Sequence, residues 1–335
     1  MYDIRPFVSA VRRVLASHSQ GEPGAYRRWI WQDAPSKRDL GINPYACADA
    51  ANLLYTIGEF PREVEQRRRW VETLRGLQDP ETGLFREATH HEIHTTAQCV
   101  ATLELFDAGP AHPLRALSEL TRVEGMERLL ESLDWSGNPW MESHKGAGMY
   151  AALVLAGETT VEWEDRYFEW LWEETDPATG LFRKGCVKPV RHDDVESVFP
   201  HIAGTFHYLF NHEYACRQIR YPKAVVDTCL EVFGSKTYPL GSRLGFAEMD
   251  WLYCLTRSMR QCGHRYDDYR SVLASFSDDY VPFLLQLDPD RDDDLNDLHV
   301  LFGVVCCLAE LQSALPGQIR TERPLRLVLD RRPFI

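Results

Sequence analysis

Stretches rich in small and apolar residues alternate along the chain with stretches that are apolar on one face only. The apolar stretches lack a polar face, which is typical of helices packed on all sides, and the stretches that precede them are typical of helices facing solvent. The apolar stretches are Ala46–Leu54, Thr95–Leu105, Gly146–Leu155, Ile202–Phe210, Met249–Leu255 and Leu298–Leu308. The pattern therefore predicts helical hairpins, each made of an outer amphipathic helix followed by an inner apolar helix.

A short motif recurs at the ends of outer helices. The segment Asp79-Pro-Glu-Thr-Gly-Leu-Phe85 returns as Asp176-Pro-Ala-Thr-Gly-Leu-Phe182, and Asp288-Pro289 is a weaker echo. Proline disfavours the helical conformation in the residue before it, and Thr-Gly completes a turn. The motif starts lie 97 and 112 residues apart, or about two hairpins each.

Six such hairpins predict an all-α fold, an (α/α)6 toroid that takes up residues 1–335 as one domain and carries an extended tail at 317–335. The inner helices are expected to begin near Asn43, His94, His144, His201, Glu248 and Asp297. An open solenoid is the alternative, but its ends would need polar capping repeats.

Composition and charge narrow the possible partners. The net charge of −13 disfavours binding to nucleic acid and to anionic membranes, although an acidic protein can still hold a local basic pocket. No apolar run reaches the length of a membrane span, and Arg5, Arg12 and Arg13 interrupt the N-terminal apolar residues, so no signal peptide is expected. Nine cysteines without a C-x-x-C pair are typical of buried thiols in a reducing compartment, which makes the cytoplasm the expected location.

Polar and aromatic residues gather at the predicted starts of the inner helices, and nine of the twelve histidines lie there or just after. In a ring whose inner helices share one polarity, these starts converge on one central funnel. Such residues also serve as helix caps, so a structural role stands beside the functional one for each of them. The predicted start of the fourth inner helix also has four polar residues shortly before it: His192, Asp193, Asp194 and Glu196.

Two motifs could indicate metal binding or terpene cyclisation. His90 and His94 are four residues apart, which suits two metal ligands on one helix face, but no third ligand is evident. The sequence therefore predicts no metal and no cofactor. The run Asp290-Arg-Asp292-Asp293 matches a pattern of some terpene cyclases, but it occupies a charged turn, and a solvated turn explains it better.

The repeated turns bring in a family resemblance. Six hairpins with Asp-Pro-x-Thr-Gly-Leu-Phe turns resemble the six-hairpin glycosidase-type enzymes, and the turn at Asp176–Phe182 is similar to a loop of unsaturated uronyl hydrolases. Cys186 follows this turn and no tryptophan-rich Arg-Gly motif comes after it, so the catalytic aspartates of those hydrolases are not carried over. The toroid is shared by polysaccharide lyases, sugar epimerases and terpenoid cyclases, and the fold does not choose among them.

The sequence predicts a carbohydrate-active enzyme, a glycoside hydrolase in the first place, with a sugar or oligosaccharide as its partner. Glycosidic cleavage uses two carboxyl groups, and Asp250 and Asp297 are the expected pair, with Glu248 in reserve and His201 or His144 as partner or base. The residues expected to stack on the sugar or to bind its hydroxyls are Trp140, Trp251, Tyr45, His94, His207, His299 and Asn43. A histidine-based epimerase or lyase, a non-catalytic binding toroid and a terpenoid cyclase are the alternatives.

Overall fold

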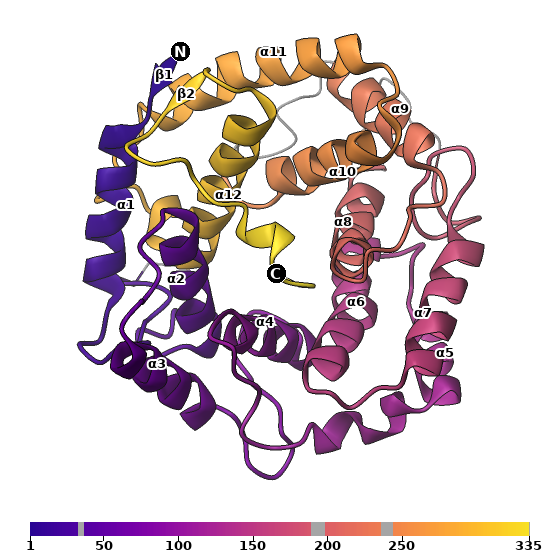
Figure 1. Cartoon of the computed structure of the whole chain (residues 1–335), viewed down its shortest axis with the longest axis horizontal. Helices are drawn as coiled ribbons and strands as arrows, with labels where there is room; N and C mark the ends of the chain where they lie inside the picture. The colour runs from indigo at the N-terminus through magenta and orange to yellow at the C-terminus, as the bar shows by residue number, and fades with distance from the viewer. Residues whose placement is uncertain (33–36, 189–197, 236–243, 335) are drawn as a thin grey trace. The chain divides into compact units, whose positions relative to one another are not determined.

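The computed structural model describes residues 1–32, 37–188, 198–235 and 244–334. These residues are mostly helical, which confirms the all-α prediction (Figure 1). The α-helices are α1 Arg5–His18, α2 Pro44–Thr56, α3 Val64–Gly76, α4 Glu92–Leu105, α5 Val123–Ser132, α6 Pro139–Leu155, α7 Val161–Glu174, α8 Phe199–Tyr214, α9 Pro222–Gly234, α10 Ala247–Cys262, α11 Tyr266–Leu284 and α12 Leu298–Ala314. In the part of the chain that is described, none of them is long and apolar enough to cross a membrane.

Buried and amphipathic helices alternate as the sequence pattern predicts. Helices α2, α4, α6, α8 and α12 are buried along most of their length, whereas α3, α5 and α7 bury one face. The buried helices begin at capping residues or prolines. The side chains of Asn43, Asn138 and Asp297 accept hydrogen bonds from the first turns of α2, α6 and α12. Helix α6 therefore starts before His144, which lies in its second turn.

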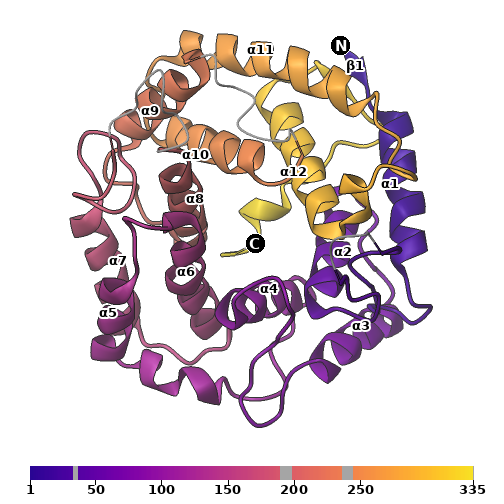
Figure 2. The same cartoon turned by 180° about the vertical axis from the view of Figure 1, so that it is seen from behind.

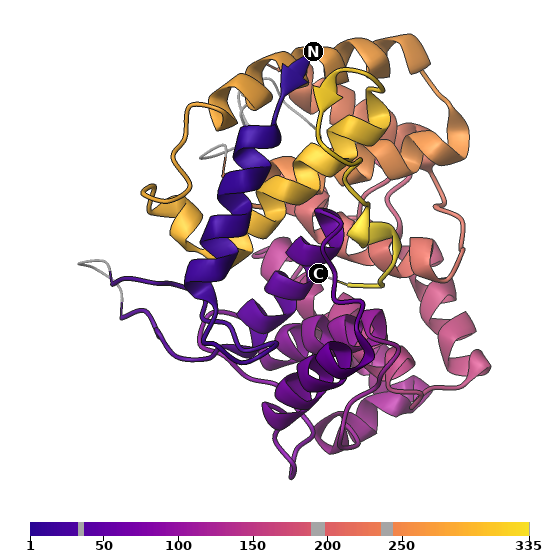
Figure 3. The same cartoon turned by 60° about the vertical axis from the view of Figure 1, so that its left-hand side comes forward.

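The described chain divides into two compact units. The first comprises residues 1–77, 242–249 and 270–328. Within it α12 packs against α2 and α1 (Figure 2). Strand β1 (Tyr2–Asp3) pairs in parallel with β2 (Ile319–Arg320), as Figure 3 shows. This short pairing ties the first residues of the chain to the segment that follows α12.

The second unit comprises residues 78–241, 250–269 and 329–335. Its central helices pack in the order α4, α6 and α8, and α5 packs against α7 (Figure 1). Glycines on α6 allow this close packing, because a Cβ at Gly146 would lie 2.0 Å from the Tyr208 hydroxyl of α8. A row of aromatic rings that includes Trp163, Tyr167 and Tyr150 fills the space between α6 and α7.

The two copies of the sequence motif form the same turn in the second unit. Asp79 Oδ1 accepts hydrogen bonds from the amides of Glu81 and Thr82, and Asp176 Oδ1 does the same for the amides of Ala178 and Thr179. Gly83 and Gly180 close the two turns at φ of 79° and 74°, a conformation that favours glycine. The motif therefore encodes one structural device used twice.

Each turn is fixed to a buried helix by a threonine. The amide of Phe85 donates to Thr96 Oγ1 of α4 at 2.9 Å, and the amide of Phe182 donates to Thr205 Oγ1 of α8 at 3.0 Å. Both phenylalanines are buried. The echo at Asp288 differs, because there Asp292 accepts from the Asp288 amide at 2.6 Å.

The segment predicted as an extended tail at 317–335 carries two short elements among its described residues, β2 and the 3-10 turn Val328–Asp330. Buried thiols, as the sequence predicts, are found at Cys99, Cys229, Cys254, Cys306 and Cys307. The nine cysteines all lie in described segments, and each is a free thiol. A single domain over residues 1–335 stays a prediction.

Candidate functional site

Three buried histidines from three helices of the second unit meet at one point. His94 lies on α4, His144 on α6 and His207 on α8, and one ring nitrogen of each lies within 4.8 Å of the others. The ring centres of His94 and His144 are 4.1 Å apart, and those of His144 and His207 are 4.6 Å apart. The packing order α4, α6, α8 creates this histidine centre, since each helix presents one imidazole to the same point.

A fourth histidine stands beside the histidine centre. The ring of His90 stacks on that of His94 with 4.9 Å between centres and 10° between planes. His90 Nδ1 lies 2.8 Å from a carboxylate oxygen of Glu87, whose side chain is only 2% exposed. Burial raises the pKa of Glu87, but the contacts with His90 and Thr89 outweigh it and hold that pKa at about 2. The ionised carboxylate therefore accepts a hydrogen bond from His90 Nδ1 and orients the ring, with Nε2 on its other side.

Ser143 sets the protonation of His207. Its Oγ donates to the Trp140 carbonyl at 2.6 Å, and the same Oγ lies 2.9 Å from His207 Nδ1. Because the hydroxyl has one proton, His207 Nδ1 is the donor in the second contact. The neutral ring then carries its lone pair on Nε2. An imidazole held in one tautomer by an outer partner is the usual arrangement of a metal-binding or catalytic histidine.

The C-terminal segment forms one wall of the histidine centre. The ring of Phe334 lies 4.8 Å from that of His94 and 5.7 Å from that of His207. The ring packs beside Gly148, one turn after His144 on α6, where a Cβ would lie 3.4 Å from it, an ordinary van der Waals distance. The wall is apolar, so it reduces the contact of the imidazoles with water.

Buried polar contacts anchor residues 329–334 to the second unit. The fully buried Arg257 pairs with Asp330 at 2.6 Å, and Arg332 donates to Thr102 Oγ1 at 3.2 Å. Asn211 of α8 donates to the Pro333 carbonyl at 2.9 Å. Charged groups leave water at a cost unless they are paired, so these partners fix the segment in one position.

An aromatic side chain lies one helical turn from His144. Trp140 opens α6, and residues four apart share a helix face. Its ring meets Phe199 edge-on at 5.6 Å and is partly exposed. A partly exposed indole beside polar groups is the kind of platform on which a sugar ring stacks.

The first unit brings together another set of the predicted residues. His299 Nδ1 lies 3.1 Å from Asp49 Oδ2, and its ring packs between Phe246 and Tyr45. Arg28 binds both carboxylate oxygens of Asp297 at 2.8 Å. Asn43 caps α2. In this unit the predicted residues thus serve helix capping, an ion pair and an aspartate–histidine pair.

The three acids predicted from sequence differ in the surroundings that decide whether a carboxyl group can act as an acid. Burial raises the pKa of Asp297, but Arg28 outweighs this effect and keeps that pKa below its usual value. A general acid needs the opposite shift. Asp250 lies in the first turns of α10 and is fully buried, and Glu248 near the start of that helix is also buried.

Two further predicted residues have structural contacts. Trp251 is fully buried and donates from its indole nitrogen to the Cys229 carbonyl at 2.9 Å. His201 Nδ1 lies 2.8 Å from the Phe182 carbonyl, and burial lowers the pKa of this imidazole. His192, Asp193, Asp194 and Glu196 lie outside the described residues.

Three residues around the histidine centre are not among those predicted from sequence: Glu87, Ser143 and Phe334. A usable signal existed for Glu87, because the spacing Glu-x-x-His places a carboxylate within reach of His90. Gly148 was a weaker signal, since a glycine inside an apolar helix often marks a close approach. Phe334 gives no local signal, because its partners lie far away along the chain.

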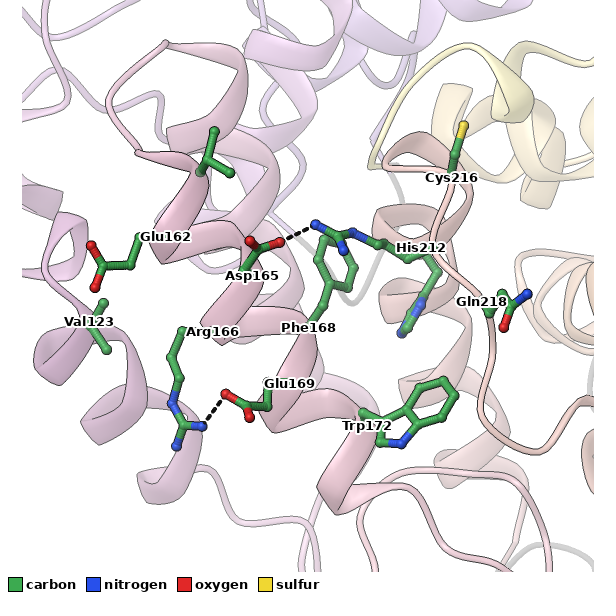
Figure 4. Close-up of a pocket in the computed structure, with 12 residues that line it drawn as sticks. Val123, Glu162, Asp165, Arg166, Phe168, Glu169, Trp172, His212, Cys216 and Gln218 are labelled. Carbon is green, nitrogen blue, oxygen red and sulfur yellow. Dashed lines mark hydrogen bonds and ion pairs between the residues drawn. The ribbon is translucent and has the colours of Figure 1, made fainter.

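A separate groove opens on the surface of the second unit between α7 and the segment after α8 (Figure 4). Its volume is about 1140 Å3. Charged side chains line it, but Asp165 pairs with Arg217, and Arg166 pairs with Glu169 at 2.6 Å. Because these charged groups form ion pairs with one another, they are less suited to binding a ligand than the imidazoles of the histidine centre.

The motif at Asp290–Asp293 is also paired within the first unit. Arg13 binds Asp290 at 2.7 Å, and Arg38 binds Asp293 at 2.7 Å. Trp31 donates to Asp293 at 2.7 Å from its indole nitrogen. These contacts agree with a structural turn.

Comparisons with known proteins leave the site to be interpreted from its own geometry. No family model matches the chain, no curated protein matches its sequence, and no solved structure matches its fold.

Proposed function

We propose that the chain is a carbohydrate-active enzyme that removes a proton from the carbon next to a carbonyl, as sugar epimerases and polysaccharide lyases do. The observation that carries the proposal is the convergence of His94, His144 and His207 beside the His90–Glu87 pair. Imidazole is the side chain whose ordinary pKa suits proton transfer near neutral pH.

The proposed step gives each group one task. His90, oriented by Glu87, takes the proton from the substrate carbon, and the electron pair of that C–H bond moves onto the carbonyl oxygen to form an enolate. The histidine centre stabilises the negative charge on that oxygen, and Trp140 stacks on the sugar ring. In an epimerase a water molecule on the opposite face then gives a proton to the carbon, and His90 releases the proton that it took to solvent. In a lyase the enolate electrons form a C=C bond and the C–O bond at the neighbouring carbon breaks. The leaving glycosidic oxygen takes the proton that His90 carries.

Histidine chemistry is preferred over the two-carboxylate hydrolysis expected from sequence. The ion pair with Arg28 favours the ionised form of Asp297, whereas a hydrolase needs one protonated carboxyl group. Hydrolysis remains the second candidate, with Asp250 as its acid. We also propose that the six hairpins close into an (α/α)6 toroid, because buried and amphipathic helices alternate in the described part of the chain.

Proton exchange tests the proposal directly. Purified protein is incubated in deuterium oxide with a panel of reducing sugars and uronic acid oligosaccharides, and NMR follows deuterium entering the position next to the carbonyl. The formation of unsaturated uronate, read by ultraviolet absorbance, reports the lyase branch. We expect exchange or elimination with one class of substrate and its loss in His90→Gln, while His112→Gln, outside the histidine centre, retains it.

Two outcomes would count against the proposal. If Asp250→Asn abolishes release of a reducing sugar while His90→Gln leaves it intact, the enzyme is a hydrolase that uses carboxylates. If sugars bind without exchange, elimination or cleavage, the chain is a binding module.

A further inference from the structure

We propose that His94, His144 and His207 bind one divalent transition-metal ion, with Zn2+ as the best fit. The catalytic use of this ion rests on the proposed function, but its binding depends only on the three side chains. Imidazole nitrogen is a preferred ligand of zinc, and sites with three protein ligands leave a fourth position for water or substrate.

The spacing of the rings suits a single ion. Zinc binds imidazole nitrogen at about 2.0–2.1 Å, so two ligands of a tetrahedral ion are roughly 3.4 Å apart. The three nitrogens of the histidine centre already lie within 4.8 Å of one another. Small rotations of the side chains close the difference without any change in the helices that carry them.

The helices supply the rigidity that such a site needs. Each ligand comes from a different helix, with His94 in the first turn of α4, and α6 packs directly on both α4 and α8. Sites built on packed helices hold their ligands more precisely than sites on loops. The histidines are buried, so their side chains have few alternative positions.

The second sphere also matches a metal site. Ser143 accepts from His207 Nδ1, so the neutral ring offers Nε2 as a ligand. Phe334 covers His94 and His207 with an apolar ring, which strengthens electrostatic interactions at the ion by excluding water. The Glu87 carboxylate, held beside the histidine centre by His90, supplies negative charge near the cation.

The alternative is a purely structural cluster of three core histidines. Such a cluster would not bind a metal ion in preference to other groups. Replacing any one of its histidines by glutamine would then have no effect on metal binding. The metal proposal instead requires all three rings at once. This difference makes the two interpretations separable by binding measurements alone.

Cobalt provides the test, because Co2+ replaces zinc in most sites and its visible spectrum reports tetrahedral coordination. The full chain is stripped with a chelator and titrated with Co2+ and then with Zn2+, with calorimetry for stoichiometry. We expect one Co2+ per chain, a visible band typical of tetrahedral geometry, and loss of that band on adding Zn2+. The variants His144→Gln and His207→Gln should both lose the band.

His201→Gln is the matched control, because His201 lies on α8 with His207 and is buried, yet it is not part of the histidine centre. It should bind Co2+ like the unaltered chain, and circular dichroism checks that each variant folds. Absence of stoichiometric binding by the unaltered chain overturns the proposal, as does binding that survives both cluster substitutions.

The test separates this inference from the proposed function. One bound Co2+ without turnover of any sugar supports the metal site and counts against the proposed enzyme. Turnover by a metal-free chain that binds no Co2+ supports the enzyme and overturns the metal site.

Discussion

Ser143 Oγ lies 2.9 Å from His207 Nδ1, although the two residues are 64 positions apart and belong to different helices. The serine has already donated its proton to the Trp140 carbonyl, so it serves only as an acceptor for the imidazole. A single hydroxyl therefore determines which nitrogen of His207 can bind a ligand.

Removing this hydroxyl should weaken metal binding more than folding. In Ser143→Ala we expect the affinity for Zn2+ to fall about 10–100-fold, the range typical of lost outer-sphere partners. Competition with a chromophoric chelator measures it. Ser143→Thr, which keeps a hydroxyl, should restore much of the affinity, and Ser132→Ala, at an exposed hydroxyl of α5, should leave it unchanged. Equal affinity in Ser143→Ala and the unaltered chain would show that Ser143 does not act through His207.

The pair formed by Arg28 and Asp297 should matter for stability. Its side chains are only 8% and 15% exposed, and removing one partner of a buried pair costs about 3–5 kcal/mol. We expect Arg28→Ala to lower the free energy of unfolding by that order in urea denaturation. Arg68→Ala breaks an exposed pair with Glu65 and should cost at most about 1 kcal/mol. Similar losses in the two variants would contradict the buried role of the pair.

Acid should destabilise the protein through two buried histidines. Burial lowers the pKa of both His18 and His212 to about 4, below the ordinary value of 6.5. Between pH 6.5 and 4 these histidines bind protons in the unfolded chain but not in the folded chain. Their contribution to the free energy of unfolding is therefore complete above pH 6.5 and is lost as the pH falls toward 4. Each histidine should contribute on the order of 3 kcal/mol over this window.

The variant His212→Gln isolates one of these contributions. Urea denaturation at several pH values should give a shallower pH dependence for His212→Gln than for the unaltered chain. His112→Gln, at a position whose side chain is partly exposed, is the control and should keep the full slope. An unchanged slope in His212→Gln would mean that His212 titrates normally in the folded protein.

The two repeated turns should respond alike to loss of their threonines. Thr205→Val leaves the buried Phe182 amide without its acceptor, and Thr96→Val does the same for Phe85. An unsatisfied buried donor costs about 1–3 kcal/mol, so both variants should lose that much stability. Thermal unfolding measures it, with Thr121→Val on the surface as the control. A loss in only one variant would mean that the two turns are not equivalent in energy.

The sequence carried enough information for the helices and for their alternation. Runs of small apolar residues identified the buried helices, and Asn43 and Asp297 marked helix starts that the structure shows as caps. The apolar pattern places the start of a helix too late where proline begins it, as at Pro139, because the apolar residues of α6 follow its first turn. The local pattern of apolar residues thus predicts which segments are helices better than it predicts where each helix begins.

The histidine centre lay beyond what local pattern can provide. His207 sits deep in α8, and its meeting with His94 and His144 depends on the register in which three helices pack. That register follows from close approaches such as the contact of Gly146 with Tyr208, which no spacing along the chain reveals. Asp297 is the opposite case, a residue that the sequence predicted to be catalytic but that forms a structural ion pair. Its partner Arg28 lies 269 residues away along the chain, so the pair could not be predicted from local pattern.

The anchoring of residues 329–334 has a consequence for the order of events during synthesis. Arg332 and its partner Thr102 are 230 residues apart, so α4 leaves the ribosome long before the segment that covers it. Contacts of such long range form slowly, because closing the intervening chain costs entropy before the contact contributes any stability. Until then the faces of His94 and His207 that meet Phe334 stay open to water and to ions. The nascent chain thus has a period in which the ion proposed for the histidine centre could reach His94 and His207 from the side that Phe334 later covers.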